Sequence, residues 1–173
     1  MSRAPFLLKP LDAAHERAAF DCERQALNRY LREQATQDIR RRVAACFVAL
    51  DDAQRIAGYY TLASASLLLA DLPPGIGKKL PRYPTVPAVR MGRLAVDEAF
   101  TGQGLDGALL ADALERAIRS EIAAYALIVD AKDDTAATFY RHHGFIPLPD
   151  TPLTLFLPLA TVEAPQRRND EAR

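Results

Sequence analysis

Several features that would assign a chain to a special class of protein are scarce here. The 22 basic and 22 acidic residues cancel, so no global positive field attracts nucleic acid, and any RNA contact must come from local patches. Two cysteines in 173 residues are too few for a disulfide framework, which favours a reducing cytoplasm with both thiols packed or inert. The three histidines, His15, His142 and His143, form no metal-ligand pattern, so we expect no metal site.

Long apolar runs and targeting signals are also missing. The longest apolar stretches, such as residues 63–70, are well short of a membrane span, and the N-terminus does not read as a signal peptide. We therefore expect a cytoplasmic protein with no membrane contact. The 49% hydrophobic content is ordinary for a globular protein with a real core. No composition break marks a second domain, so we expect one domain over residues 1–164 and a flexible charged tail over 165–173.

Hydrophobic periodicity predicts a mixed α/β fold in which helices pack on a sheet. The expected strands are residues 6–11, 43–50, 55–62, 88–96, 125–130, 145–148 and 154–159. The expected helices are residues 22–42, 105–119 and 131–143; we expect Asp21 to cap the first helix and Gly144 to end the last. The first helix should bury a stripe formed by Ala26, Leu27, Tyr30, Leu31, Ala35 and Ile39.

Residues 72–87 differ from the rest of the chain. They hold five of the twelve prolines, together with two glycines and the cations Lys78, Lys79 and Arg82. Because proline removes a backbone donor and fixes φ, this composition predicts a long, basic, partly ordered loop. Such a loop can be functional or a solvated surface insert, and the sequence leaves both interpretations open.

A glycine-rich turn is the most informative motif. The strand residues Arg93 to Asp97 are followed by Thr101-Gly102-Gln103-Gly104-Leu105-Asp106-Gly107-Ala108, which opens a helix. Glycines let backbone amides approach a ligand closely, and a helix N-terminus adds unpaired amides and a positive dipole end. This pattern predicts a phosphate or pyrophosphate site. Ala108 follows Gly107 where a P-loop needs lysine, and the mid-chain position argues against a dinucleotide fold.

The motifs taken in order resemble the GNAT superfamily of acetyl-coenzyme A-dependent N-acetyltransferases. The similarity is closest to the TacT/AtaT-like toxins of type II toxin–antitoxin pairs and covers residues 6–159. The resemblance implies a mixed, mostly antiparallel central sheet with helices on both faces and a splay between the fourth and fifth strands. The segments that carry it are Phe20-Asp21-Cys22, Leu27-Asn28-Arg29-Tyr30-Leu31, Gly58-Tyr59-Tyr60-Thr61-Leu62, Pro84-Thr85-Val86-Pro87, Gly92-Arg93-Leu94-Ala95-Val96-Asp97, Phe139-Tyr140 and Gly144-Phe145.

The resemblance also assigns roles around acetyl-CoA. Backbone groups of Leu94 and Val96 would align the pantetheine arm and polarise the thioester carbonyl. Tyr140 matches the position whose phenol protonates the departing thiolate, a reasonable transfer because the phenol pKa is near 10 and the thiol pKa about 8.5. The full set expected to bind the cofactor is Leu94, Ala95, Val96, Thr101, Gly102, Gln103, Gly104, Leu105, Asp106, Gly107, Ala108 and Phe139.

Two residues depart from the family turn. Thr101 stands where glutamine or arginine is usual, and its hydroxyl can still donate to a phosphate. Asp106 stands where the last glycine or alanine is usual, and a carboxylate about 4 Å from a phosphate would oppose binding. The side chain can instead turn to solvent, where an aspartate in a first helical turn is favourable. The sequence leaves both orientations open.

The acceptor is expected to be an aminoacyl-tRNA. No strong general base is evident, and an α-amine titrates near pH 8, so it needs less help than a lysine amine near 10.4. The toxins that this chain resembles acetylate charged tRNA and stop translation, act with a ribbon-helix-helix antitoxin, and often form homodimers. Candidate RNA contacts are Arg40, Arg41, Lys78, Lys79, Arg82, Arg90 and Arg93. The alternatives are a GNAT enzyme acting on a small amine or a protein N-terminus, and an antitoxin-binding module whose catalysis is weakened by Asp106.

Overall fold

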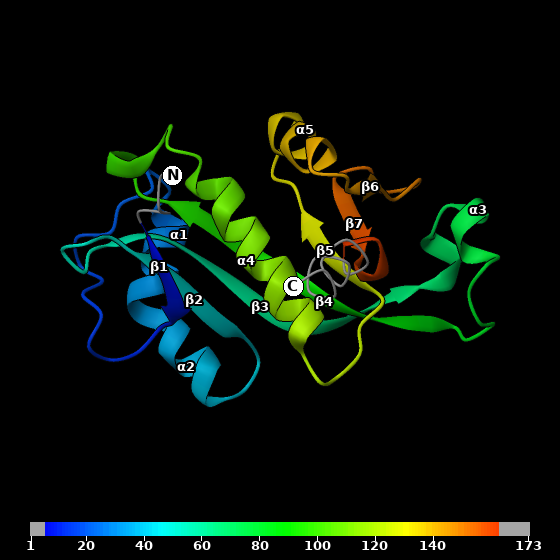
Figure 1. Cartoon of the computed structure of the whole chain (residues 1–173), viewed down its shortest axis with the longest axis horizontal. Helices are drawn as coiled ribbons and strands as arrows, with labels where there is room; N and C mark the ends of the chain where they lie inside the picture. The colour runs from blue at the N-terminus through cyan, green and yellow to red at the C-terminus, as the bar shows by residue number, and fades with distance from the viewer. Residues whose placement is uncertain (1–5, 163–173) are drawn as a thin grey trace, which may run out of the picture. The chain divides into compact units, whose positions relative to one another are not determined.

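The computed structural model describes residues 6–162 and divides into two compact units (Figure 1). The first unit takes its described residues from Met1–Ala63 and Gly92–Ala113, and the second from Ser64–Met91 and Leu114–Arg173. Strands β3 (Ile56–Leu68) and β4 (Thr85–Val96) and helix α4 (Leu105–Arg119) contribute residues to both units. The described strands form one seven-stranded sheet in the order β1-β2-β3-β4-β5-β7-β6.

The first unit pairs β1 (Leu7–Pro10) antiparallel with β2 (Ala45–Leu50), and β2 antiparallel with the first part of β3. Helix α1 (Gln25–Arg29) runs through a π-helical segment, η1 (Tyr30–Gln34), into α2 (Ala35–Arg40). The prediction of one continuous helix over residues 22–42 is therefore only partly correct. A wider turn of this kind is rare and occurs mostly inside longer helices.

The start of this helix also differs from the sequence prediction. Arg24 stands at the N-cap of α1 and makes no side-chain cap, so the expectation that Asp21 caps the helix is wrong. The Asp21 carboxylate instead accepts hydrogen bonds from the Glu23 amide and the Asn28 side chain. Asn28 is drawn inward by this contact and is buried, whereas Ala26, expected in the buried stripe, is exposed.

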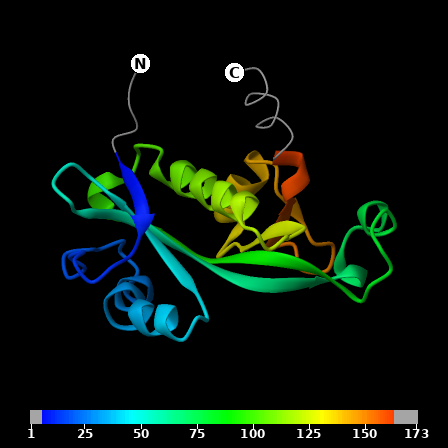
Figure 2. The ribbon, with the colours of Figure 1, turned by 60° about the horizontal axis from the view of Figure 1, so that its bottom comes forward.

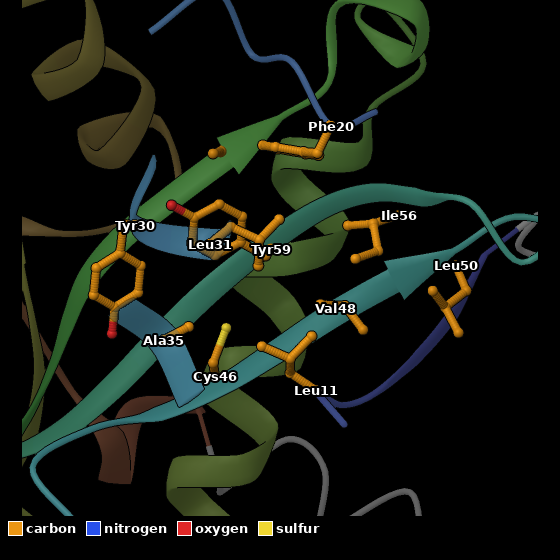
Figure 3. Packing of buried hydrophobic residues seen from close by; sticks show 11 residues of the cluster. Leu11, Phe20, Tyr30, Leu31, Ala35, Cys46, Val48, Leu50, Ile56 and Tyr59 are labelled. Atoms are coloured by element: carbon orange, nitrogen blue, oxygen red, sulfur yellow. The ribbon is translucent and has the colours of Figure 1, made fainter. Parts of the chain in front are cut away.

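Aromatic and aliphatic side chains build the core of the first unit (Figure 3). The Tyr59 ring stacks on Tyr30 at 6.3 Å between centroids and meets Phe20 edge-on at 5.5 Å. Burying such rings is a large favourable term, and their fixed geometry adds to it. The buried members of this cluster are Leu11, Phe20, Tyr30, Leu31, Ala35, Cys46, Val48, Leu50, Ile56, Tyr59 and Ala95.

The second unit joins part of β4 in parallel to β5 (Ala126–Asp130), which pairs antiparallel with β7 (Thr154–Pro158). The short strand β6 (Ile146–Pro147) pairs antiparallel with β7, and helix α5 (Asp134–His142) follows β5. The β3–β4 hairpin carries the 3-10 helix η2 (Leu69–Asp71) and the short helix α3 (Pro74–Gly77) at its far end (Figures 1 and 2).

This end of the hairpin corrects the prediction of a partly ordered loop over residues 72–87. Leu72 is buried, and Ile76 and Leu80 pack against the same cluster as Phe156 of β7. These apolar contacts order the proline-rich segment, which periodicity alone does not reveal. β4 begins at Thr85 rather than residue 88, and β3 continues to Leu68 rather than ending at residue 62.

The predicted order of helices and strands is confirmed, and α4 has the bounds expected for it. The fold is the mixed α/β, mostly antiparallel sheet expected from the sequence, with β4 and β5 as its parallel pair. Between residues 6 and 162, every helix is too short or too polar to cross a bilayer. A single domain over residues 1–164 stays a prediction, and the tail over 165–173 lies outside the described residues.

Candidate active site

The glycine-rich turn lies in the first unit, between the end of β4 and the start of α4. Gly102 and Gly104 adopt φ angles of +78° and +76°, a region that residues with a Cβ atom rarely adopt. A Cβ atom at either position would meet nothing within 4 Å. Glycine is therefore required here by backbone conformation and not by lack of space. The residues from Thr101 to Gly104 are exposed, so their backbone is accessible to a ligand.

Backbone amides at the start of α4 give this turn the chemistry of an anion site. The amide of Ala108 donates to the Gly104 carbonyl at 3.1 Å, which closes the first helical turn. The first amides of a helix have no carbonyl partner within the helix, and the helix dipole is positive at this end. The turn can therefore hold a phosphate or pyrophosphate, as the sequence indicates.

The Asp106 side chain already forms a hydrogen bond with one of these amides. Its Oδ1 atom accepts a hydrogen bond of 2.8 Å from the Gly107 amide, and the residue is exposed. The carboxylate thus lies against an amide predicted to hold the cofactor, rather than simply pointing into solvent. Thr101 is similarly engaged, because its hydroxyl donates to the Glu98 carbonyl at 3.0 Å.

A buried carboxylate fixes the approach to the turn. Asp97 is 3% exposed and caps the 3-10 helix η3 (Glu98–Phe100) by accepting from the Ala99 amide at 2.9 Å. Its second oxygen accepts from the Asp21 amide at 2.9 Å, and the Asp21 carbonyl accepts from the Glu98 amide at 2.9 Å. These bonds tie the segment before α1 to the segment that enters the turn.

Asn28 completes this network. Its side-chain oxygen accepts from the Cys22 amide at 2.9 Å, and its nitrogen donates to the Asp21 carboxylate at 3.0 Å. Hydrogen bonds from the Glu23 amide and from Asn28 hold the pKa of Asp21 below its usual value. The positioning role of Asp97 was not predicted from the sequence. The signal was an aspartate at the start of a short helical turn, which is a preferred cap.

Gly58 allows close packing beneath α4. A Cβ atom on Gly58 would lie 2.9 Å from the Ala95 carbonyl oxygen and 3.0 Å from a Leu109 methyl group. Only glycine fits between β4 and the first turns of α4 at this distance. On β4 itself, Ala95 is buried, whereas Leu94 and Val96, expected to face the cofactor through their backbone, are half-buried. The parallel pairing of β4 with β5 covers Ala88–Met91, and β4 continues to Val96.

Tyr140 lies in the second unit, near the end of α5. The Asp133 side chain caps this helix by accepting from the Ala136 amide at 2.8 Å. At the other end Gly144 has φ +94°, its amide donates to Arg141, and the Phe145 amide donates to the Tyr140 carbonyl at 3.1 Å. This is the Schellman arrangement, and it confirms Gly144 as the stop signal.

Neighbouring rings hold the Tyr140 side chain. Tyr140 is 7% exposed and packs against Phe139 and Phe145, with ring centroids 5.2 and 5.6 Å away. Phe139 is half-buried and also contacts His143 at 4.7 Å. His142 and His143 are exposed, in agreement with their predicted place at the helix surface. A tyrosine fixed by packing in this way can serve as a proton donor.

The structure separates the predicted RNA-binding cations into two groups. Arg90 forms an ion pair with Asp130, and the Arg93 guanidinium lies 3.5 Å from the centre of the Tyr30 ring. Both are half-buried and already engaged. The remaining five are exposed and make no side-chain ion pair or hydrogen bond with residues 6–162. These are Arg40 and Arg41 in the first unit and Lys78, Lys79 and Arg82 in the second.

Comparison with known proteins identifies the class to which this fold and turn belong. The model of the acetyltransferase (GNAT) domain matches residues 42–147. The chain belongs to the GNAT family of acetyltransferases, as the sequence motifs indicated. Acetyl-CoA is the acetyl donor of such enzymes, and the exposed residues of the turn fit its pyrophosphate, which the Asp106 carboxylate opposes.

Proteins of this family that are similar to the chain include toxins. A probable toxin TacT from Sinorhizobium fredii is 30% identical over 169 residues, covering 91% of this chain and 93% of that protein. A tRNA-acetylating toxin from Mycobacterium tuberculosis is 36% identical over 146 residues, covering 83% and 86% of the two chains.

Solved toxin structures share the fold over nearly the whole length. AtaT complexed with acetyl-methionyl-tRNAfMet has a TM-score of 0.85 at 32% identity, covering 91% of this chain and 97% of that one. AtaTR bound with acetyl-CoA has a TM-score of 0.78 at 31% identity, covering 92% and 96%. An AtaT variant bound to the C-terminus of the antitoxin AtaR has a TM-score of 0.78 at 26% identity, covering 92% and 97%.

Proposed function

We propose that this chain is a toxin that uses acetyl-CoA to acetylate the α-amino group of an aminoacyl-tRNA and thereby blocks translation. The observation that carries the proposal is the exposed turn at Gly102 and Gly104, which stands at the positive end of α4. The acceptor is supported by the relatives, since one is a tRNA-acetylating toxin and another was solved with acetyl-methionyl-tRNA.

The residues of the turn would bind and orient the donor. Backbone amides of residues 102–107 hold the pyrophosphate, and the backbone of Leu94 and Val96 aligns the pantetheine arm. When bound, acetyl-CoA supplies an acetyl group activated as a thioester. Hydrogen-bond donors preorganised in this way stabilise charge that develops on the carbonyl oxygen.

Tyr140 is proposed to donate its phenolic proton to the thiolate of the departing coenzyme A. Packing by Phe139 and Phe145 fixes the ring, so little orientation entropy is lost at that step. The acceptor amine needs no strong base, because an α-amine with a pKa near 8 is partly neutral at physiological pH. This favours an aminoacyl group over a lysine side chain.

The partners follow from the same relatives. We propose a ribbon-helix-helix antitoxin whose tail covers the toxin, a homodimeric assembly and a cytoplasmic location. An antitoxin C-terminus bound to AtaT supports the first of these. Exposed cations without carboxylate partners support RNA contacts by Arg40 and Arg41 in the first unit and by Lys78, Lys79 and Arg82 in the second.

Labelled acetyl-CoA incubated with bulk charged tRNA tests the proposal. We expect label on the aminoacyl group, and we expect Tyr140→Phe to reduce transfer by roughly 10²- to 10⁴-fold without changing acetyl-CoA affinity. Tyr125→Phe, which removes the hydroxyl of a half-buried tyrosine of the second unit and leaves the rings around Tyr140 in place, is the matched control and should keep most of the activity. Label that appears only on small amines or peptide N-termini would refute the tRNA assignment.

A further inference from the structure

The far end of the β3–β4 hairpin carries an exposed aromatic ring that the proposed chemistry does not use. Tyr83 is 66% exposed, whereas every other phenylalanine and tyrosine among residues 6–162 is buried or half-buried. Its ring stacks on no other ring of the described chain, and its hydroxyl makes no hydrogen bond there. An exposed tyrosine ring offers a flat face on which another ring can stack.

The segment that presents Tyr83 is well ordered. Leu72 is 3% exposed in the apolar cluster of the second unit, and Ile76 and Leu80 pack against that cluster. The Leu69 amide donates to the Pro84 carbonyl at 3.0 Å, which closes the end of the hairpin. Pro84 also restricts the backbone of Tyr83, since a residue before proline is held out of the helical region. Packing and backbone hydrogen bonding therefore hold the segment that carries the Tyr83 ring in place.

Basic residues lie close to Tyr83 in the sequence at the end of the hairpin. Lys78, Lys79 and Arg82 are exposed and have no carboxylate partner among residues 6–162. Asp71 is the one acidic residue between positions 69 and 85. We call Lys78, Lys79, Arg82 and Tyr83 the hairpin-end surface.

We infer that the hairpin-end surface binds an unpaired nucleotide of the RNA substrate, with Tyr83 stacking on the base and the three cations on adjacent phosphates. This rests on the proposed function and names the part of the RNA that is contacted. Bases in a duplex are stacked on each other and offer no free face, whereas unpaired bases stack readily on exposed tyrosine rings. Positive charge without carboxylate partners complements the phosphate backbone.

Binding of labelled RNA, followed by fluorescence anisotropy, tests this inference. The probes are bulk tRNA, a short single-stranded RNA and a blunt RNA duplex of equal length. Tyr83→Ala should weaken binding of the tRNA and the single strand by roughly 5- to 150-fold and leave the duplex unaffected. Tyr83→Phe should bind within about threefold of the unmodified chain, because the stacking face is kept.

Charge and stacking can be separated by salt. Replacing Lys78 and Lys79 by glutamine should reduce the slope of log affinity against log salt by about 1.4 for the single strand, at about 0.7 per phosphate. Tyr83→Ala should leave this slope unchanged. Ile122→Ala, which removes another exposed apolar side chain of the second unit, is the matched control and should alter neither quantity.

Three results would overturn the inference. The first is single-strand affinity unchanged in Tyr83→Ala, and the second is equal weakening by alanine and phenylalanine. The third is a Tyr83→Ala chain that binds RNA normally but loses self-association or antitoxin-peptide binding, which would assign the surface to a protein partner. If the unmodified chain binds RNA through Tyr83 but does not acetylate tRNA, only the proposed function is contradicted.

Discussion

The carboxylate of Asp106 accepts a hydrogen bond of 2.8 Å from the backbone amide of Gly107, the residue that follows it. The bond stabilises the start of α4, because a negative charge is favourable at the positive end of a helix. The same bond takes an amide from the set that would hold the pyrophosphate. Under the proposed function, Asp106 is an internal anion that would compete with the donor for the turn.

Two substitutions of Asp106 separate its charge from its hydrogen bond. Asp106→Asn removes the charge but keeps an acceptor, and we expect acetyl-CoA to bind about fivefold tighter. Asp106→Ala also frees the Gly107 amide, and we expect about a further fivefold. Isothermal titration calorimetry measures both. Glu115→Gln, which makes the same charge change further along α4, should leave affinity unchanged, and equal affinity for all four chains would rule out competition.

Gly104 should be intolerant of alanine even though space is available. Its φ of +76° costs an L-residue about 1–2 kcal/mol, so Gly104→Ala should lower the free energy of unfolding by that amount and weaken acetyl-CoA binding. Gly75→Ala is the matched control, since its Cβ atom would also meet nothing within 4 Å and its φ is ordinary. Urea unfolding should show no loss for Gly75→Ala; equal losses at both positions would contradict a conformational cause.

Acidic residues near the turn give a pH dependence of stability. The pKa of Glu98 is raised, first by its hydrogen bond to Glu23 and then by the negative charges of Asp21 and Glu23. An acid with a raised folded-state pKa contributes stability below its unfolded pKa, near 4.3, and this contribution is lost as pH rises through the folded value. Glu98→Gln should therefore raise Tm by roughly 1–3 °C at pH 7 and have little effect at pH 4.

Differential scanning fluorimetry across pH 4 to 8 checks this expectation. Glu121→Gln changes another exposed glutamate of the described chain and should give no pH-dependent difference. A gain in Tm for Glu98→Gln that is the same at both ends of the range would show that proton linkage is not its cause.

Burial should make both thiols unreactive in the folded chain. Burial raises the pKa of Cys46 to about 12 and also raises that of Cys22, so neither forms much thiolate at pH 8. In Cys22→Ser, the rate at which a disulfide reagent modifies Cys46 should follow global unfolding and rise steeply with urea. Fast modification without urea would show that the cluster around Cys46 opens locally.

Local signals in the sequence predicted the elements whose ends are set by the backbone. Gly104 and Gly144 need positive φ, so they mark the start of α4 and the end of α5 wherever the rest of the chain packs. Elements that depend on distant partners were not predictable in this way. The π-helical turn at Tyr30 accompanies contacts with Tyr59 and Arg93, and neither contact is visible from helical spacing.

The candidate site shows the same division. The turn and its exposed backbone follow from glycine positions alone, whereas the Arg90 ion pair with Asp130 depends on β4–β5 pairing. Two of the seven predicted RNA contacts, Arg90 and Arg93, are engaged by tertiary contacts that their place in the sequence does not reveal. The ordered end of the hairpin likewise depends on Leu72 and Phe156, residues far apart in the chain.

Asn28 gives the fold a position with a single acceptable chemistry. The residue is 3% exposed, and its side-chain amide donates to the Asp21 carboxylate and accepts from the Cys22 amide, so the position needs both a donor and an acceptor. Aspartate there would set two negative charges side by side, and leucine would leave the Cys22 amide without its acceptor and the Asp21 carboxylate with one donor fewer. A library of all nineteen replacements should thus find position 28 as sensitive as the turn glycines, although it lies outside the reacting groups.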